Sequence, residues 1–126
     1  AARALARGLV LAYPRIVRGA LALALHRATP AELVPGPLGL LEPRPDAPAV
    51  EPDACALILM PGLAFDRQGA RLGWGRGHYD ATLASAPAAR RAGLAYESQL
   101  VDRLPTDAHD LPFHLIVTEA GVHRPA

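Results

Sequence analysis

The sequence contains no lysine, because all 13 of its basic residues are arginine. A Walker A phosphate-binding loop and the ATP site of a protein kinase both depend on a lysine side chain, so both are excluded. A catalytic Schiff base forms on a lysine amine and is excluded as well. The commonest lysine-dependent ATP sites and covalent mechanisms are therefore not available to this chain.

Cysteine is almost as scarce. Cys55 is the only one, which excludes a disulfide framework and a cysteine-based zinc site. Because Cys55 lies inside the apolar run of residues 54–60, we expect a packed thiol rather than a reactive one.

The chain has no long hydrophobic run and no large excess of charge. Apolar stretches such as residues 57–60 are far too short to span a bilayer, and the first residues do not follow the pattern of a signal peptide. The formal net charge of +1 gives no support for a nucleic-acid or membrane partner. We therefore expect a cytoplasmic protein with neither of these partners.

The length and composition predict one globular domain covering residues 1–126, since 51% of the residues are hydrophobic. Short apolar segments bounded by glycine or proline predict strands at residues 9–13, 19–25, 54–60, 92–96 and 113–118. Helical spacing predicts helices at residues 1–7 and 78–86. Alternating helices and strands indicate an α/β fold.

Two of these segments have a particular character. Residues 54–60 are apolar throughout, which is typical of a central strand buried on both faces. Residues 29–50 are rich in proline, so we expect a long surface connection there rather than extended regular structure.

The most informative stretch is residues 71–80, with the sequence RLGWGRGHYD, which we call the signature loop. Its alternating glycines free the backbone to direct N–H groups toward a ligand. Arg71 and Arg76 add positive charge and Asp80 adds a carboxylate, a combination that suits a polyphosphate with a divalent cation. The loop also lies between a predicted strand and a predicted helix, where open α/β sheets bind ligands.

Simpler interpretations of the signature loop remain open. The glycines are also compatible with a tight turn, although their spacing is not that of the dinucleotide-binding G-x-G-x-x-G motif. Asp80 is also compatible with a first-turn acid that complements the helix dipole. His78 is suited to hydrogen bonding with a ligand or to a solvated position, and Trp74 to stacking on a flat ring system.

A second acid, Asp110, follows much later in a polar loop. If that loop folds back toward Asp80, the two carboxylates and phosphate oxygens would form an oxygen-rich site of the kind that magnesium prefers. By itself, Asp110 is an ordinary loop carboxylate. His109 and His114 do not have the spacing of a zinc site, and we expect them to be structural.

Taken together, these motifs resemble the 5-formyltetrahydrofolate cyclo-ligase family, also called 5,10-methenyltetrahydrofolate synthetases. Residues 60–66, Gly69 and residues 71–80 resemble the family signature MPGLAFD…G.RLGYGGGYYD. Supporting matches lie along almost the whole chain: Gly8, residues 13–15, 39–43 and 93–96, Gln99, residues 104–105, 109–110 and 117–119.

This resemblance implies a three-layer α/β/α domain around a mostly parallel sheet, and an enzyme that uses ATP and magnesium. The family converts 5-formyltetrahydrofolate to 5,10-methenyltetrahydrofolate and releases ADP and phosphate. The formyl oxygen is phosphorylated by the γ-phosphate, and the neighbouring folate nitrogen then attacks the activated carbon as phosphate leaves. The protein aligns the reactants and neutralises charge.

Carried over by position, the residues that would contact the ATP phosphates are Arg71, Leu72, Gly73, Trp74, Gly75, Arg76, Gly77, His78 and Tyr79. Those that would also border the folate are Trp74, Gly75, Arg76, Gly77 and His78. Arg76 is the expected catalytic residue, able to touch the γ-phosphate during transfer. Asp80 and Asp110 resemble the two magnesium-linked acids.

Family members have a further N-terminal region, with a basic helix that reaches the nucleotide and an acidic segment near the folate. We therefore expect this chain to be the C-terminal two-thirds of a cyclo-ligase-like fold, acting as a monomer. Two alternatives to the enzyme are a truncated relative that binds nucleotide or folate without catalysis and an unrelated sugar-phosphate enzyme on a similar fold.

Overall fold

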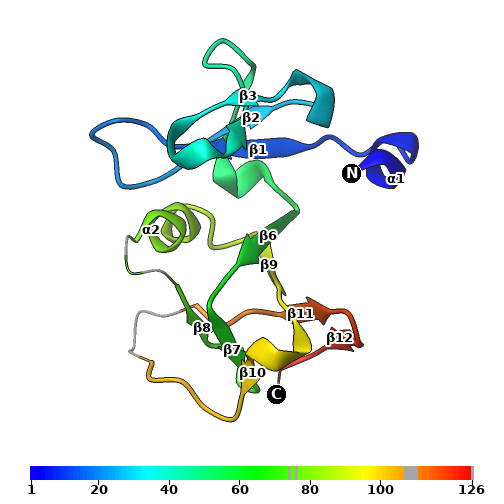
Figure 1. Cartoon of the computed structure of the whole chain (residues 1–126), viewed down its shortest axis with the longest axis vertical. Helices are drawn as coiled ribbons and strands as arrows, with labels where there is room; N and C mark the ends of the chain where they lie inside the picture. The colour runs from blue at the N-terminus through cyan, green and yellow to red at the C-terminus, as the bar shows by residue number, and fades with distance from the viewer. Residues whose placement is uncertain (74, 76, 107–110, 126) are drawn as a thin grey trace.

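The computed structural model describes residues 1–73, 75, 77–106 and 111–125 (Figure 1). This part of the chain contains the short helices α1 (Ala2–Ala6) and α2 (His78–Ala84), together with twelve short strands. Turns of 3₁₀-helix connect several strands, at Pro30–Glu32, Pro37–Gly39, Pro52–Ala54 and Glu97–Gln99. In the described ranges, no helix combines the length and the apolar character that a membrane crossing would need.

The largest sheet contains four strands in the order β12-β11-β9-β6. Its members are β6 (Leu57–Pro61), β9 (Arg90–Leu94), β11 (Leu115–Thr118) and β12 (Gly121–His123). β9 pairs in parallel with both β6 and β11, whereas β11 and β12 form an antiparallel hairpin. Helix α2 lies in the connection between β6 and β9 (Figure 1), as expected for a crossover between parallel strands.

The N-terminal half forms antiparallel pairs, which lie at the top of the view in Figure 1. Strands β1 (Ala12–Arg15), β2 (Ala24–Arg27) and β5 (Ala49–Val50) make one sheet. Strands β3 (Val34–Pro35) and β4 (Leu41–Glu42) make a separate pair. The proline-rich segment therefore contains only two-residue strands and 3₁₀ turns, which agrees with the expectation that it holds little regular structure.

A third sheet carries the beginning of the signature loop. Strand β7 (Ala64–Asp66) pairs antiparallel with β8 (Arg71–Leu72) and in parallel with β10 (Leu100–Val101). It lies in the lower part of the view in Figure 1, away from β1 and β2.

The predicted α/β class is confirmed as a mixed α/β fold. The parallel pairs are concentrated in the four-stranded sheet, while the other sheets contain antiparallel pairs. The expected three-layer arrangement around a mostly parallel sheet stays a prediction.

Three strand predictions are wrong in part. Proline was expected to end the first strand, but Pro14 pairs with Leu25 inside β1. β1 is an edge strand, where the missing N–H of a proline can face away from the ladder. The strand predicted at residues 19–25 begins only at Ala24, because Gly19 adopts a left-handed φ of 81° in the preceding turn.

The predicted central strand also differs from expectation. β6 begins at Leu57 and forms an edge of its sheet, so Leu57 and Leu59 are 48% and 53% exposed. Cys55 precedes the strand and is half-buried rather than fully packed. Desolvation raises the pKa of its thiol, which disfavours the reactive thiolate.

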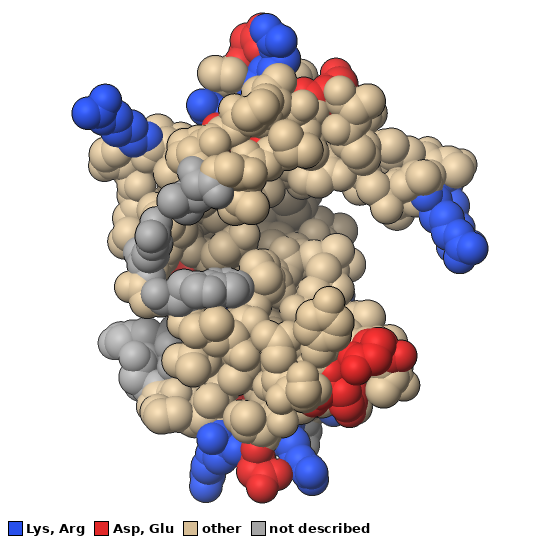
Figure 2. Space-filling model, viewed as in Figure 1, with Lys and Arg blue, Asp and Glu red and all other residues tan. Residues whose placement is uncertain are grey.

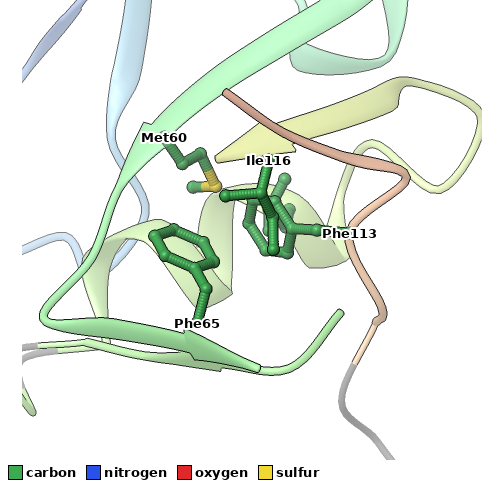
Figure 3. Packing of buried hydrophobic residues seen from close by; sticks show 5 residues of the cluster. Met60, Phe65, Phe113 and Ile116 are labelled. Atoms are coloured by element: carbon green, nitrogen blue, oxygen red, sulfur yellow. The ribbon is translucent and has the colours of Figure 1, made fainter. Parts of the chain in front are cut away.

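The hydrophobic core lies between the four-stranded sheet, α2 and β7. Its buried members are Met60, Phe65, Leu83, Phe113 and Ile116. Figure 3 shows the labelled side chains pointing toward one another from different elements of the chain. The rings of Phe65 and Phe113 meet edge to face, with centroids 5.5 Å apart and an interplanar angle of 74°.

Glycine at position 93 is required for this packing. A Cβ atom added to Gly93 would lie 2.6 Å from Cζ of Phe65, which is closer than real contacts allow. We expect Gly93→Ala to lower the free energy of unfolding by about 1–3 kcal/mol through overpacking, measured by urea denaturation.

A second background tests the cause of this loss. In a Phe65→Leu chain the ring atoms that face Gly93 are absent, so adding Gly93→Ala should lower the stability by much less. An equal loss in both backgrounds would show that contact with the ring is not the reason for glycine.

Candidate functional site

A tight turn between β7 and β8 sets the direction of the signature loop. Gly69 N donates to Asp66 O at 3.2 Å, and Gly69 has a left-handed φ of 89°, so residues 66–69 form a tight turn. The buried Asp66 carboxylate accepts hydrogen bonds from the backbone N–H groups of Gln68, Ala70 and Leu104 at 2.8–2.9 Å. Asp66 therefore fixes the backbone that leads into Arg71.

Arg71 is the most constrained charged residue of the site. Its side chain is only 6% exposed, and its Nε donates to Pro61 O at 2.7 Å. The guanidinium carbon lies 5.3 Å from the centre of the Tyr79 ring, and Nη1 lies 3.4 Å from Oδ1 of Asp80. The guanidinium is thus fixed by the end of β6 and by two residues of α2.

Burial affects the ionisation of Arg71 and of Tyr79. Desolvation lowers the pKa of Arg71, an effect that the Asp80 carboxylate opposes, and arginine remains charged because its ordinary pKa is so high. Desolvation raises the pKa of Tyr79, which keeps its phenol neutral and able to donate a hydrogen bond. The site therefore contains a desolvated, permanent positive charge.

The glycines around Arg71 serve different purposes. A Cβ at Gly73 would lie 2.9 Å from Nη1 of Arg71, so this glycine leaves space for the guanidinium. Gly75 and Gly77 have left-handed φ values of 83° and 75°, and Gly77 directly precedes α2. The backbone of the loop therefore requires glycine at these two positions.

His78 and Thr82 attach the N-terminal half of the chain to α2. The Nδ1 atom of His78 lies 2.6 Å from Leu21 O. Leu23 N donates to Oγ1 of Thr82 at 2.8 Å, and that hydroxyl donates to His78 O. The sequence predicted either a hydrogen bond to a ligand or a solvated ring for His78, but the ring instead contacts the backbone of Leu21.

These contacts create a cavity of about 410 Å³ between the two halves of the chain. Its lining comes from the N-terminal strands and from the signature loop: Pro14, Ile16, Leu23, Pro37, Leu40, Leu41, Glu42, Pro61, Arg71, Gly73, Gly75, Gly77, His78, Tyr79 and Asp80. In Figure 2, many of the charged side chains of the described residues lie at the upper and lower ends of the visible face. We call this space the first cavity.

A second cavity, of about 860 Å³, lies beside the first. Its lining includes Gln68, Ala70, Leu83, Ala84, Pro87, Thr106, Leu111, Pro112 and Phe113. Arg71 and Asp80 belong to the lining of both cavities. A ligand in each cavity would therefore have the same guanidinium and carboxylate in reach.

Of the two predicted metal ligands, Asp80 and Asp110, only Asp80 is among the described residues. Asp80 is an exposed carboxylate, 78% accessible, whose described contact is the one with Arg71, so it retains acceptor oxygens for a hard cation. Asp110 lies outside the described residues, as do Trp74, Arg76 and His109, although Thr106 and Leu111 flank that segment in the second cavity. Within the described ranges, no group of three or more metal-ligating side chains comes together.

His114 has the structural role expected of it. Its Nδ1 accepts a hydrogen bond from Arg91 N at 3.0 Å. Desolvation, with the nearby arginines, lowers the pKa of the ring and favours its neutral form.

Sequence reasoning missed the wall that the N-terminal half contributes to the first cavity. Leu40 and Leu41 are more than 60% exposed and Glu42 is nearly buried, yet no local pattern marks this segment as part of a site. The one available signal is its place among the segments that resemble the cyclo-ligase family. Gln99 is another residue that was marked only by this resemblance. Its Nε2 donates to Gly62 O at 2.9 Å and so holds the loop before β7.

The fold and site define a mixed α/β protein with a glycine-rich loop and a buried arginine between two cavities. Residues 2–119 match the model of the 5-formyltetrahydrofolate cyclo-ligase family. The chain therefore belongs to the 5-formyltetrahydrofolate cyclo-ligase family.

Relatives and solved structures agree with this assignment. The 5-formyltetrahydrofolate cyclo-ligase of Mycolicibacterium smegmatis is 40% identical over 96 residues, which is 74% of this chain and 50% of that protein. The Escherichia coli enzyme is 37% identical over 95 residues, 73% of this chain and 52% of that protein. The chain thus spans about half the length of these curated relatives.

The NMR structure of Aquifex aeolicus 5,10-methenyltetrahydrofolate synthetase superimposes with a TM-score of 0.81 at 36% identity, covering 98% of this chain and 61% of that one. A 5,10-methenyltetrahydrofolate synthetase from Mycoplasma pneumoniae gives a TM-score of 0.67 at 22% identity, covering 90% of this chain and 58% of that one, and supports the fold alone.

The attachment of the N-terminal half to α2 can be tested at Thr82, which is 2% exposed. Thr82→Val keeps the shape of the side chain but leaves the N–H of Leu23 without its acceptor. We expect a loss of about 1–3 kcal/mol in the free energy of unfolding, measured by urea denaturation. Thr106→Val, at an exposed position, is the control, and equal stability of the two variants would contradict the assigned role.

Proposed function

We propose that this chain carries the site of an ATP- and magnesium-dependent conversion of 5-formyltetrahydrofolate to 5,10-methenyltetrahydrofolate, with release of ADP and phosphate. The observation that carries the proposal is the position of Arg71 and Asp80 in the lining of two adjacent cavities. A reaction between two bound small molecules requires such a shared boundary. Family membership supplies the identity of the two molecules.

The first cavity is suited to the reduced folate. Its volume of about 410 Å³ lies in the range of small-molecule pockets, and its walls are mainly apolar with a few polar groups. The pterin ring of the folate is flat and partly polar, so it matches such walls. The bordering roles of Trp74, Gly75, Arg76, Gly77 and His78 are part of the same proposal.

The polyphosphate would lie along residues 71–79, with the second cavity beside it. Arg71 supports this placement, because its guanidinium is desolvated and already fixed by Pro61 O and Tyr79. A charge held in this way stabilises developing negative charge without reorganisation during the reaction. We assign the γ-phosphate contact during transfer to Arg76.

Magnesium fits the donors at this boundary, since Asp80 presents carboxylate oxygens and needs few of them for Arg71. Asp80 and Asp110 would hold the ion together with phosphate oxygens. When bound, the ion would neutralise phosphate charge. Asp80 also fixes the orientation of the Arg71 guanidinium, so one carboxylate would serve both charges.

The chemistry then has two steps. The formyl oxygen attacks the γ-phosphorus, so that an O–P bond forms and the bond to ADP breaks. The neighbouring folate nitrogen, which loses its proton, attacks the formyl carbon as the C–O bond to phosphate breaks. The residues of the chain hold the two ligands in line and keep water away from the activated carbon.

A second candidate function is ligand binding without turnover. It is the alternative that the sequence raised, and the chain spans about half the length of the curated relatives it matches. We also propose, as expected from the sequence, that the chain is a single domain with a three-layer fold. We propose further that it is monomeric and cytoplasmic.

One set of measurements separates these functions. The chain is titrated calorimetrically with ATP–magnesium and with 5-formyltetrahydrofolate, and the absorbance of methenyltetrahydrofolate is followed in the presence of both. ATP-dependent turnover supports the enzyme, and binding without turnover supports the second candidate. Binding of neither ligand overturns both.

The metal assignment predicts that Asp80→Asn and His114→Asn differ in their effect on magnesium-dependent ATP binding. Asp80→Asn should weaken magnesium-dependent ATP binding by about tenfold or more, because a metal ligand and the partner of Arg71 are altered together. His114→Asn should have little effect, since that ring bonds the backbone of Arg91. Titration with ATP in the presence and absence of magnesium measures both, and equal effects would argue against Asp80 as a ligand.

A further inference from the structure

Glu42 is a carboxylate in the wall of an otherwise mainly apolar cavity. It ends β4, and its side chain is 12% exposed. Gly36 lies against it so closely that a Cβ at position 36 would be 2.8 Å from Oε2. The backbone of the β3–β4 pair therefore holds this side chain in place at the lining of the first cavity.

The contacts that Glu42 makes within the described chain are few and long. Oε2 accepts from Ile16 N at 3.4 Å, at the limit of a hydrogen bond, and Oε1 lies 3.7 Å from Nε of Arg15. That Nε is buried and has no hydrogen-bond partner among the described residues. Since an ionised carboxylate has about four acceptor positions, Glu42 retains most of its capacity.

A nearly buried carboxylate with spare acceptor positions is unfavourable unless donors satisfy it. Among the described residues, the partners of this carboxylate are the Ile16 N–H and the Arg15 guanidinium, and the lining residues Pro14, Leu40 and Leu41 make no hydrogen bond to it. The missing donors would therefore come from the occupant of the cavity. That occupant must present N–H groups at one edge and an apolar face to the leucines.

We propose that Glu42 binds the paired N–H donors of the pyrimidine half of the reduced folate, an inference that rests on the proposed function. In a 2-amino-4-oxopyrimidine ring, the N3–H and the 2-amino group are neighbours in one plane. This pair matches the two oxygens of a carboxylate, as a guanidinium does in a bidentate ion pair. Glu42 is thus a substrate-binding residue outside the signature loop.

This placement also orients the ring toward the reacting groups. The formyl-bearing nitrogen lies on the other ring of the pterin, away from the pyrimidine edge. Arg71 and Asp80 line the same cavity as Glu42 but belong to the signature loop. Glu42 therefore selects both the identity of the ring and which of its ends reaches Arg71.

A purely structural role for Glu42 makes a different prediction. If the carboxylate only attached β4 to β1 through Arg15 and Ile16, its replacement would alter stability but would not distinguish one folate from another. The test therefore compares two ligands as well as two variants.

The variant is Glu42→Gln, and the matched control is Glu51→Gln, at an exposed position outside the cavity lining. Each protein is titrated calorimetrically with 5-formyltetrahydrofolate, with its analogue that carries hydrogen in place of the 2-amino group, and with ATP–magnesium. We expect Glu42→Gln to bind the folate about 10- to 100-fold more weakly. Its ATP–magnesium affinity should equal that of the unmodified chain, and Glu51→Gln should behave as the unmodified chain throughout.

The analogue provides the second arm, which needs no variant. The unmodified chain should bind the analogue at least tenfold more weakly than the folate, and Glu42→Gln should lose most of this discrimination. If Glu42→Gln does not fold, the analogue measurement on the unmodified chain still decides the question. Equal affinity for the two ligands overturns the inference.

The outcomes also separate this inference from the proposed function. If the unmodified chain binds the folate and Glu42→Gln binds it equally well, only the role of Glu42 is overturned. If the unmodified chain does not bind the folate, the proposed substrate is overturned together with the inference.

Discussion

The buried guanidinium of Arg71 is the interaction on which the rest of the site depends. Its Nε bonds to the last residue of β6, its plane lies beside the ring of Tyr79, and its Nη1 faces Asp80. A charge so little exposed is tolerated only with such partners. They link β6, β8 and α2 and place one fixed positive charge at the boundary of two cavities. Gly73 is required by the same constraint, because a side chain there would overlap the guanidinium.

The first cavity depends on a second attachment, between α2 and the segment before β2. The hydrogen bond from Leu23 N to Thr82 and the contact between His78 and Leu21 O hold the N-terminal half against the signature loop. The walls supplied by that half are mainly apolar, and Glu42 is their charged exception. In the proposed function, both halves of the chain would therefore contribute to the folate site, and the signature loop would also hold the phosphates.

Much of the local structure follows from the sequence. The helix after Gly77 and the α/β class were predicted from the period of apolar positions and from the alternation of helices and strands. Which strands lie at the edges of the sheets was less predictable. Pro14 lies within β1 and Leu57 is exposed on β6, because both strands lie at sheet edges, and edge position depends on pairing that no local pattern encodes.

The sequence by itself determined the signature loop: its glycines, Arg71 and Asp80 are consecutive in the chain, so backbone freedom and charge could be recognised from spacing. Only the tertiary structure decided what surrounds the loop. Thr82 meets a partner 59 residues away and His78 one 57 residues away, and Glu42 reaches the same cavity from the proline-rich segment. Such contacts depend on which faces pack together, and a shift of one residue in strand register would direct Glu42 to the other face.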